Sequence, residues 1–343
     1  MRAVFLVAVL ITHSRNLPPV YAAEPARFEF ESRHMGTTFR VVVFADKATA
    51  TKAAAAGFAR VAALEAVMSD YRPDSEVMLA CKTNDTALGK PIRVSDDLLA
   101  VLTRSAEMSR VSGGAFDVTV GPLSKLWRVS RKTQELPDAK ELAAALALVG
   151  PNKVTLDPAA KTVTLAVPGM RLDFGGVGKG FAADEVLKLL KRDFGITFAL
   201  VAAAGDITCG DAPPGQPGWA VEIAPLRTGG PKRTLTLANA SVSTSGDLEQ
   251  VAVIGGVRYS HVLNPKTGLG LTGRRSVTVI ARDGTTADGA TKGASVLPVD
   301  RALEFVAKLP GAEVLIVTQL DDAKPEQATS SPGFARFLAK PSP

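Results

Sequence analysis

The segment Leu172–Asp184 (LDFGGVGKGFAAD) combines glycines with a lysine and could bind phosphate. Glycines let a backbone approach a ligand closely, a helix that follows offers free N–H groups, and Lys179 adds a positive charge. The segment is not a P-loop, because Gly180 stands where a serine or threonine is required and Asp173 stands where the first glycine belongs. It also lacks the spacing of the dinucleotide-binding fingerprint. From these residues alone, a phosphate-binding turn and a simple turn into a helix are both open.

His261 is a second candidate for chemistry, because the chain has only three histidines. An imidazole titrates near neutral pH and can take a proton from a hydroxyl group, so His261 could act as a general base. A single histidine beside a strand is more often structural. The residue type by itself therefore leaves the role of His261 open.

Helices and strands must bring such residues together, and their order indicates the fold class. Hydrophobic periodicity predicts helices and strands that mix without a strict β-α-β alternation. This order favours an α+β fold with mixed, largely antiparallel sheets packed against helices. The chain after residue 320 is polar and is expected to be at least partly irregular. The predicted helices are 47–68, 96–109, 138–148, 181–192, 286–296 and 300–308, and the predicted strands are 39–44, 153–156, 162–167, 198–203, 219–223, 234–237, 251–254, 276–281 and 314–318.

Length and composition favour one large domain or two closely joined ones, in a chain that does not bind nucleic acid. The chain has 343 residues, of which 46% are hydrophobic and 22% charged, enough to bury a sizeable core. Its formal net charge of +6 is spread among 34 acids, without the basic run that nucleic acids attract. Cys81 and Cys209 could form a disulfide or could be two buried thiols, and the sequence favours neither.

The first residues are typical of an export signal. Residues 1–2 provide a positive start, residues 3–11 are apolar, and residues 20–22 (VYA) fit a cleavage site. The apolar run is far shorter than the roughly 20 residues of a membrane-spanning helix. A buried N-terminal strand is the alternative, which the polar residues 12–19 disfavour. We therefore expect a signal peptide over 1–22 and an exported domain over 23–343, periplasmic or associated with the cell envelope, without a transmembrane helix.

Eight segments, taken in order, resemble the ApbE family of FAD:protein FMN transferases. The resemblance covers nearly the whole chain after residue 22, and it implies a single ApbE-like unit with a flavin cleft between its two halves. The segments are His34–Phe39 (HMGTTF), Met68–Val77 (MSDYRPDSEV), Gly113–Trp127 (GGAFDVTVGPLSKLW), Leu172–Asp184 (LDFGGVGKGFAAD), Ala204–Gly210 (AGDITCG), Ser241–Glu249 (SVSTSGDLE), Tyr259–Gly268 (YSHVLNPKTG) and Ser276–Thr291 (SVTVIARDGTTADGAT).

The resemblance implies a reaction at the pyrophosphate of FAD. A Thr or Ser hydroxyl of a target flavoprotein would attack the FMN phosphate, AMP would leave, and the flavin would stay attached through a phosphoester, with Mg²⁺ as the usual cation. The implied acceptor is a subunit of a membrane redox complex or another exported protein. Two alternatives are a non-catalytic relative that binds FAD and an FAD pyrophosphatase that releases FMN and AMP.

The resemblance also implies a catalytic and metal-binding set with one departure. His261 would be the base, and Asp288 a metal ligand together with the backbone at Gly176. Lys292 stands where the family has a second metal-binding hydroxyl, and a charged lysine cannot bind Mg²⁺, although it could neutralise a phosphate. Either Thr291 takes the ligand role or this chain depends less on metal than its relatives. A solvent-facing helix lysine is the plain alternative for position 292.

The remaining candidates would contact FAD. Two polar side chains that the family has near them are absent from this chain. Flat rings could pack on Met35 or Tyr71, Asp117 could accept a hydrogen bond from ribose or adenine, and Ser243–Gly246 would form a hydroxyl-rich turn. The family's Asn-x-Gly-Gly-Asp is 202–206 (AAAGD) here and an Asp of its histidine segment is Asn264, which we expect to weaken flavin or target binding. The candidates for cofactor contact are Met35, Tyr71, Ala115, Phe116, Asp117, Asp173, Lys179 and Ser245.

Overall fold

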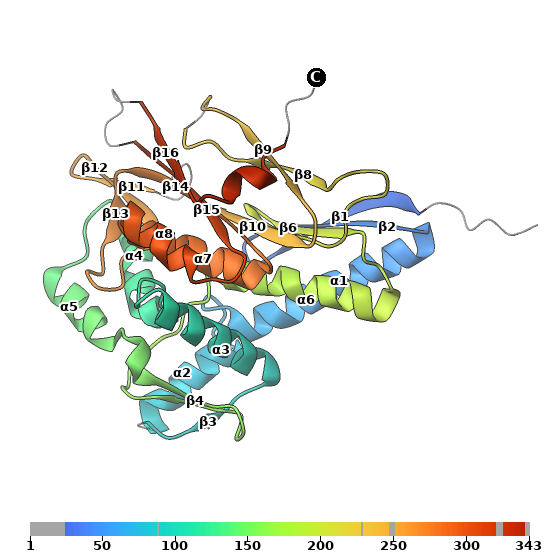
Figure 1. Ribbon diagram of the computed structural model, residues 1–343. Helices are drawn as coiled ribbons and strands as arrows, with labels where there is room; N and C mark the ends of the chain where they lie inside the picture. Colours follow the sequence, from blue (N-terminus) through green and yellow to red (C-terminus); the bar gives the residue numbers. More distant parts are fainter. Residues whose placement is uncertain (1–24, 88, 228, 247–250, 320–324, 340–343) are drawn as a thin grey trace, which may run out of the picture.

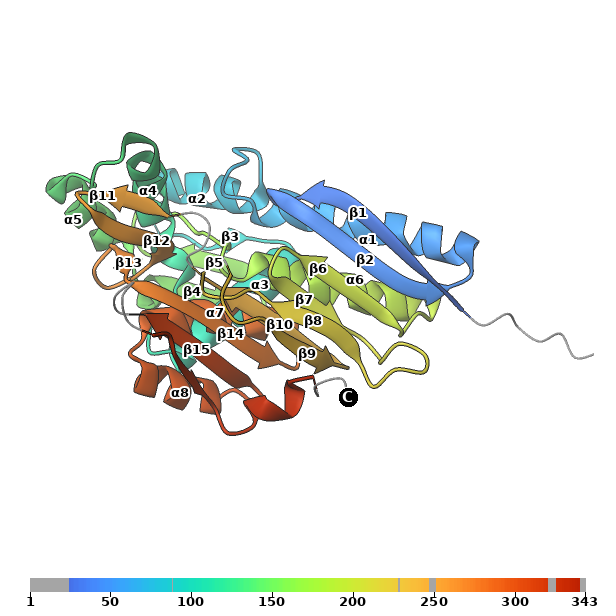
Figure 2. The same cartoon turned by 90° about the horizontal axis from the view of Figure 1, so that it is seen from above.

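The computed structural model describes residues 25–87, 89–227, 229–246, 251–319 and 325–339, so the predicted signal peptide lies outside the described residues. Its centre is an eight-stranded sheet in which all neighbouring strands are antiparallel (Figures 1 and 2). In spatial order the strands are β1 (Ala26–His34), β2 (Thr37–Ala45), β6 (Ala199–Ala203), β7 (Asp206–Cys209), β10 (Ala240–Ser245), β14 (Arg274–Ala281), β15 (Glu313–Gln319) and β16 (Gln327–Ser330).

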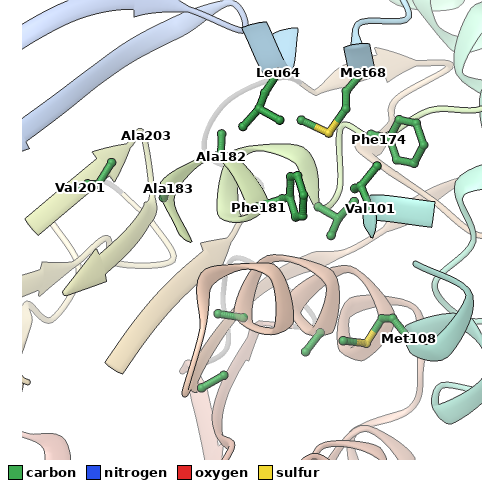
Figure 3. Packing of buried hydrophobic residues seen from close by; sticks show 14 of the residues in the cluster. Leu64, Met68, Val101, Met108, Phe174, Phe181, Ala182, Ala183, Val201 and Ala203 are labelled. Atoms are coloured by element: carbon green, nitrogen blue, oxygen red, sulfur yellow. The ribbon is translucent and has the colours of Figure 1, made fainter. Parts of the chain in front are cut away.

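Helices cover one face of this sheet and a small second layer covers the other (Figure 1). The alternation of β2 shows why: Val41 and Val43 belong to the large core on the helix side, whereas Val42 belongs to the core on the opposite side. Figure 3 shows part of the helix-side core, where Leu64 and Met68 lie near Phe181 and Phe174. The covering helices are α1 (Lys47–Met68), α6 (Gly178–Phe194), α7 (Gly284–Val296) and α8 (Val299–Ala307), and the second layer is β8 (Trp219–Ile223), β9 (Arg233–Leu237) and η3 (Phe334–Phe337).

Two further groups of elements lie beside the helix layer. The indole N–H of Trp127 in α4 donates to the carbonyl of Gly268 at 2.7 Å and so ties the helical hairpin α4–α5 to a small sheet. The first group is α4 (Gly121–Thr133), α5 (Ala139–Leu148), β11 (Ala252–Ile254), β12 (Val257–Leu263) and β13 (Gly270–Thr272). The second is α2 (Glu76–Ala87), β3 (Ile92–Arg93), α3 (Asp96–Val111), β4 (Val154–Asp157) and β5 (Thr162–Leu165), with short 3-10 turns η1 (Val118–Val120) and η2 (Pro151–Lys153).

Side-chain caps in the sequence explain where several helices begin. The Asp46 carboxylate accepts from the first N–H groups of α1, and Ser95 caps α3 through the N–H of Leu98 at 3.1 Å. Asp283 caps α7 in the same way, through the N–H of Thr286 at 2.8 Å. Among the described residues, no helix is both long and apolar enough to cross a bilayer.

The fold confirms the α+β prediction and corrects several details. Helix α6 begins three residues before the predicted 181, and the predictions missed α2 and α4 and the strands β1, β3, β7, β10, β12, β13 and β16. Within the tail that was expected to be partly irregular, residues 327–330 form β16, which pairs with β15, and the Phe334 side chain is buried. Cys81 and Cys209 are free buried thiols in the cores on opposite faces of the sheet, so they do not form a disulfide.

Candidate functional site

A cavity of about 1120 Å³ opens where loops from both halves of the chain meet. It lies among the β1–β2 turn, the end of α1, the loop before α6, the β6–β7 turn, β12 and α7. Small-molecule sites usually measure about 300–1,000 Å³, so this cavity has room for a ligand as large as a dinucleotide.

The structure brings nearly all predicted site residues to this cavity. Asp288 and Thr291 are the exceptions, because both side chains are fully buried behind the residues that line the cavity. Asp288 pairs with Lys292 and Lys179, which do line the cavity. The predicted residues that line the cavity are Met35, Tyr71, Ala115, Phe116, Asp117, Asp173, Gly176, Lys179, Ser245, His261 and Lys292.

Close contact between α6 and α7 positions the glycine-rich segment. A Cβ at Gly180 would lie 2.1 Å from the carbonyl oxygen of Gly284, so only glycine lets these helix starts approach. At this contact the N–H of Gly180 donates to Asp288 Oδ2 at 3.2 Å. The segment is therefore a turn into a helix that also places Lys179 on the cavity wall.

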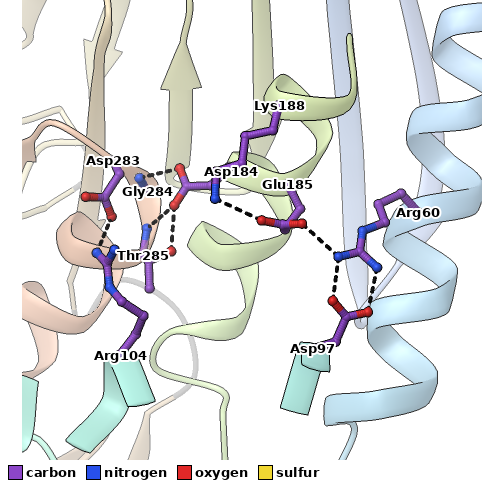
Figure 4. Close-up of polar contacts among 9 residues, drawn as sticks. All are labelled: Arg60, Asp97, Arg104, Asp184, Glu185, Lys188, Asp283, Gly284 and Thr285. Carbon is purple, nitrogen blue, oxygen red and sulfur yellow. Dashed lines mark hydrogen bonds and ion pairs between the residues drawn. The ribbon is translucent and has the colours of Figure 1, made fainter. Parts of the chain in front are cut away.

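Asp184, which sequence reasoning did not select, fixes the start of α7 (Figure 4). Its carboxylate accepts from the N–H of Gly284 at 2.6 Å and from the N–H and hydroxyl of Thr285 at 2.9 and 2.5 Å. Burial raises the pKa of Asp184 to about 6. The only signal in the sequence was an acid at the end of the glycine-rich segment, and nothing there indicated its partner 100 residues later.

Two lysines and two aspartates form a compact ion-pair network in the cavity wall. Lys179 Nζ lies 3.0 Å from Asp206 Oδ2 and 3.9 Å from Asp288 Oδ2, and Lys292 Nζ lies 2.8 Å from Asp288 Oδ1. Burial acts to lower the pKa of Lys179, but Asp288 and Asp206 outweigh it and raise that pKa. Burial acts to raise the pKa of Asp288, but the two lysines hold it below its usual value. Asp288 is therefore an ionised carboxylate with 0% exposure, stabilised by its two cations.

Hydroxyl groups close this network into a ring. Ser243 donates to Asp206 Oδ1 and lies 3.4 Å from Thr291 Oγ1. Thr291 donates to the carbonyl oxygen of Asp288 at 2.7 Å and accepts from Lys292 Nζ at 3.0 Å. The prediction of a hydroxyl-rich turn over 243–246 was wrong for 243–245, which lie in strand β10 between β7 and β14.

The residues expected to hold Mg²⁺ do not fit a metal ion. Lys292 Nζ already contacts Asp288 Oδ1 and Thr291 Oγ1, and a Cβ at Gly176 would lie 3.0 Å from Lys292 Cγ. The Lys292 ammonium therefore occupies the position between the candidate oxygen ligands. The Lys292 side chain is only 17% exposed, so the alternative interpretation of Lys292 as a solvent-facing helix lysine is wrong.

A second charged cluster, missed in the sequence, lies on the cavity wall near Tyr71. Arg128 pairs with Asp70, lies 4.0 Å from Asp173, and stacks its guanidinium 3.8 Å above the Tyr71 ring. Burial, followed by repulsion from Asp173, raises the pKa of Asp70. Tyr71 is 73% exposed, which leaves much of its surface free for a flat ligand. Asp70 stands next to Tyr71 in the quoted segment, but only the fold shows its contact with Arg128.

Asp117 and Asp173 each use one carboxylate oxygen to hold their own loop. Asp117 Oδ1 accepts from the N–H and the hydroxyl of Thr119, both at 2.8 Å, and burial raises the pKa of Asp117. Asp173 Oδ1 accepts from the N–H of Gly175 at 2.7 Å. The predicted contact of Asp117 with ribose or adenine stays a prediction.

His261 lies in β12 and reaches the cavity with an imidazole that is neutral at neutral pH. Burial, and then the charge of Lys292, lowers the pKa of His261 to about 4. Its Nδ1 is buried and has no hydrogen-bond partner within the described part of the chain. A buried ring nitrogen without a partner can exchange a proton with a bound substrate.

Comparisons with known proteins agree on one family. The family model described as "ApbE family" matches residues 35–316. An FAD:protein FMN transferase of Haemophilus influenzae is 33% identical over 295 residues, which cover 82% of this chain and 84% of that protein. A protein of the same name from Salmonella typhimurium is 30% identical over 347 residues, covering 98% and 97%. The solved structure of flavin transferase ApbE from Vibrio cholerae matches with a TM-score of 0.81 at 26% identity, covering 92% of this chain and 100% of that one.

Proposed function

The chain belongs to the ApbE family and is a transferase that acts on flavin, and from this premise we propose that it moves FMN from FAD to a Thr or Ser hydroxyl of a target protein. The product would carry the flavin through a phosphoester, and AMP would be released. The observation that carries this proposal is that Lys179, Lys292 and His261 all line one cavity large enough for a dinucleotide.

The lysines suit the phosphates of FAD because charge must be neutralised there as the phosphoryl group is transferred. Both ammonium groups stand on the cavity wall, and both are held by buried carboxylates rather than free to move with solvent. Such fixed positive charge stabilises developing negative charge without reorganisation during the reaction. Tyr71 and Met35, which line the same cavity, offer surface for the flat rings of the donor.

The chemical step follows from the neutral His261. The acceptor oxygen forms a bond to the phosphorus of the FMN moiety, and its proton passes to the imidazole. The bond between that phosphorus and the bridging oxygen breaks, and AMP leaves with the electron pair. A pKa of about 4 makes free His261 a weak base. The anionic phosphates of the donor raise this pKa on binding and so favour protonation of the ring during the step.

The proposed mechanism does not use Mg²⁺, because the Lys292 ammonium contacts the oxygens that would have to bind such an ion. Residues 1–22 support export, so we place the enzyme in the periplasm or at the cell envelope. The acceptor proposed for it is a flavoprotein subunit of a membrane redox complex or a soluble exported protein.

Product analysis tests the proposal. The protein lacking residues 1–22 is mixed with FAD and a threonine-bearing acceptor peptide, and peptide mass, AMP and free FMN are measured. A transferase gives one AMP for each FMN attached to the peptide. A pyrophosphatase gives AMP and free FMN, a simple FAD-binding protein gives neither, and each of these two results would refute the proposal. His261→Ala should lower the transfer rate by about 10²- to 10⁴-fold while FAD still binds.

A further inference from the structure

Lys292 occupies a position that was expected to belong to a metal ion. Its Nζ lies 2.8 Å from Asp288 Oδ1 and 3.0 Å from Thr291 Oγ1, the side-chain oxygens of the two residues expected to bind the metal. Both residues are fully buried, and the charge of the Asp288 carboxylate is compensated inside the protein by the lysines.

The backbone beside Lys292 is shaped to let its side chain pass. A Cβ at Gly176 would lie 3.0 Å from Lys292 Cγ and 3.4 Å from the Phe116 ring, so a larger residue would crowd the lysine stem. Gly176 also lines the cavity, next to the position that the stem crosses. This close contact is independent of the ion pair, and it shows that the loop before α6 accommodates lysine at position 292.

Charge and donor count indicate what the ammonium can bind. A lysine ammonium has three N–H donors, and Lys292 uses two of them on Asp288 and Thr291. No protein partner within the described residues accepts the third, and Lys292 lines the cavity. The two lysines balance the two aspartates of the network, so a divalent ion would place excess positive charge next to Lys292, whereas the remaining N–H donor of Lys292 can still bind an anionic oxygen.

We propose that the Lys292 ammonium replaces a divalent metal ion and binds the pyrophosphate of the flavin dinucleotide directly, so that donor binding and transfer by this chain do not require a metal. The inference rests on the proposed function for the identity of the donor. The inference itself is a different claim from the proposed reaction, because it concerns which cation contacts the phosphates of the donor.

Binding measurements on the wild-type protein provide the first test, and they require no variant to fold. FAD binding is followed by quenching of flavin fluorescence in EDTA and in millimolar Mg²⁺, and riboflavin, which has no phosphate, is the reference ligand. We expect the FAD affinity to agree within about twofold in the two conditions. An FAD affinity that rises tenfold or more with Mg²⁺, or an absence of FAD binding in EDTA, would overturn the inference.

Two variants at position 292 provide the second test. Lys292→Met removes the donor, and we expect about tenfold to hundredfold weaker FAD binding with unchanged riboflavin binding, the usual effect of losing a hydrogen bond to a charged group. Lys292→Thr restores a hydroxyl and removes the ammonium, so FAD binding and transfer should now need Mg²⁺, with Mn²⁺ bound in electron paramagnetic resonance. Lys188→Met is the matched control, because Lys188 pairs with Glu185 at 2.9 Å on α6 and does not line this cavity.

The outcomes separate this inference from the proposed function. Metal-independent FAD binding that depends on Lys292, without any peptide adduct, would support the inference and refute the transferase. A peptide adduct that forms only with Mg²⁺ would support the transferase and overturn the inference. Lys292→Met that binds FAD as tightly as wild type would also overturn the inference.

Discussion

Gly180→Ala tests whether the α6–α7 contact organises the site. The new Cβ would lie 2.1 Å from Gly284 O and 2.9 Å from Asp288 Cβ, whereas real Cβ contacts essentially never fall below 3.0 Å. The clash is with backbone, so no side-chain rotation relieves it. To reach 3.0 Å from Gly284 O, the two helix starts must separate by about 0.9 Å, and overpacking of this kind costs about 1–3 kcal/mol or more.

Gly178→Ala is the matched control, two residues earlier in the same helix. Its Cβ would lie 3.7 Å from Phe174 Cβ and 3.8 Å from Met68 Cε, which are ordinary contacts. Alanine favours a helix over glycine by up to about 1 kcal/mol, so we expect this variant to be as stable as wild type or slightly more stable. Both substitutions add one methyl group, and only the room available differs.

The assay is urea unfolding followed by circular dichroism, together with FAD transfer kinetics. The unfolding midpoint should fall for Gly180→Ala and stay or rise for Gly178→Ala. Because Gly180 N–H donates to Asp288, a shift of about 1 Å here should also lower transfer by about 10²-fold under conditions where the variant is folded. Equal midpoints for Gly180→Ala and wild type would show that the helices yield easily and would refute this reasoning.

Two further perturbations follow from burial and hydrogen bonding. The pKa of His261 is about 4 because burial and Lys292 favour the neutral ring, so kcat/KM should rise with pH through about 4 and then be unaffected by this group up to neutral pH. An acid limb near 6.5 that disappears in a His261 variant would contradict this. Asp184→Asn should destabilise the fold by about 1–3 kcal/mol, because an amide has only one acceptor oxygen and its NH2 group would face either the N–H of Gly284 or the two donors of Thr285. Asp193→Asn, which alters an exposed ion pair on the same helix, should leave the urea midpoint nearly unchanged, and equal midpoints for the two variants would contradict the capping role.

The sequence was informative wherever a local rule decides the structure. Helix α1 spans the predicted 47–68 because Asp46 caps a run of strong helix formers, and β8 spans the predicted 219–223 because its buried and exposed residues alternate. The same local rules failed for β10, where a serine-rich run suggested a turn. The strand is central in the sheet, and its Ser243 is buried because Asp206 accepts its hydrogen bond.

The sequence by itself determined the family and the residue types of the site, because eight segments in a fixed order identify both without coordinates. It also placed Asp288 and Lys292 four residues apart, the spacing at which helical side chains meet. Only the tertiary structure decided how these residues work. Lys179 meets Asp206 and Asp288 from a different helix, and the low pKa of His261 arises from burial among groups that are distant in sequence. Electrostatic effects depend on distance and on exclusion of water, and both are properties of the folded chain rather than of its residue order.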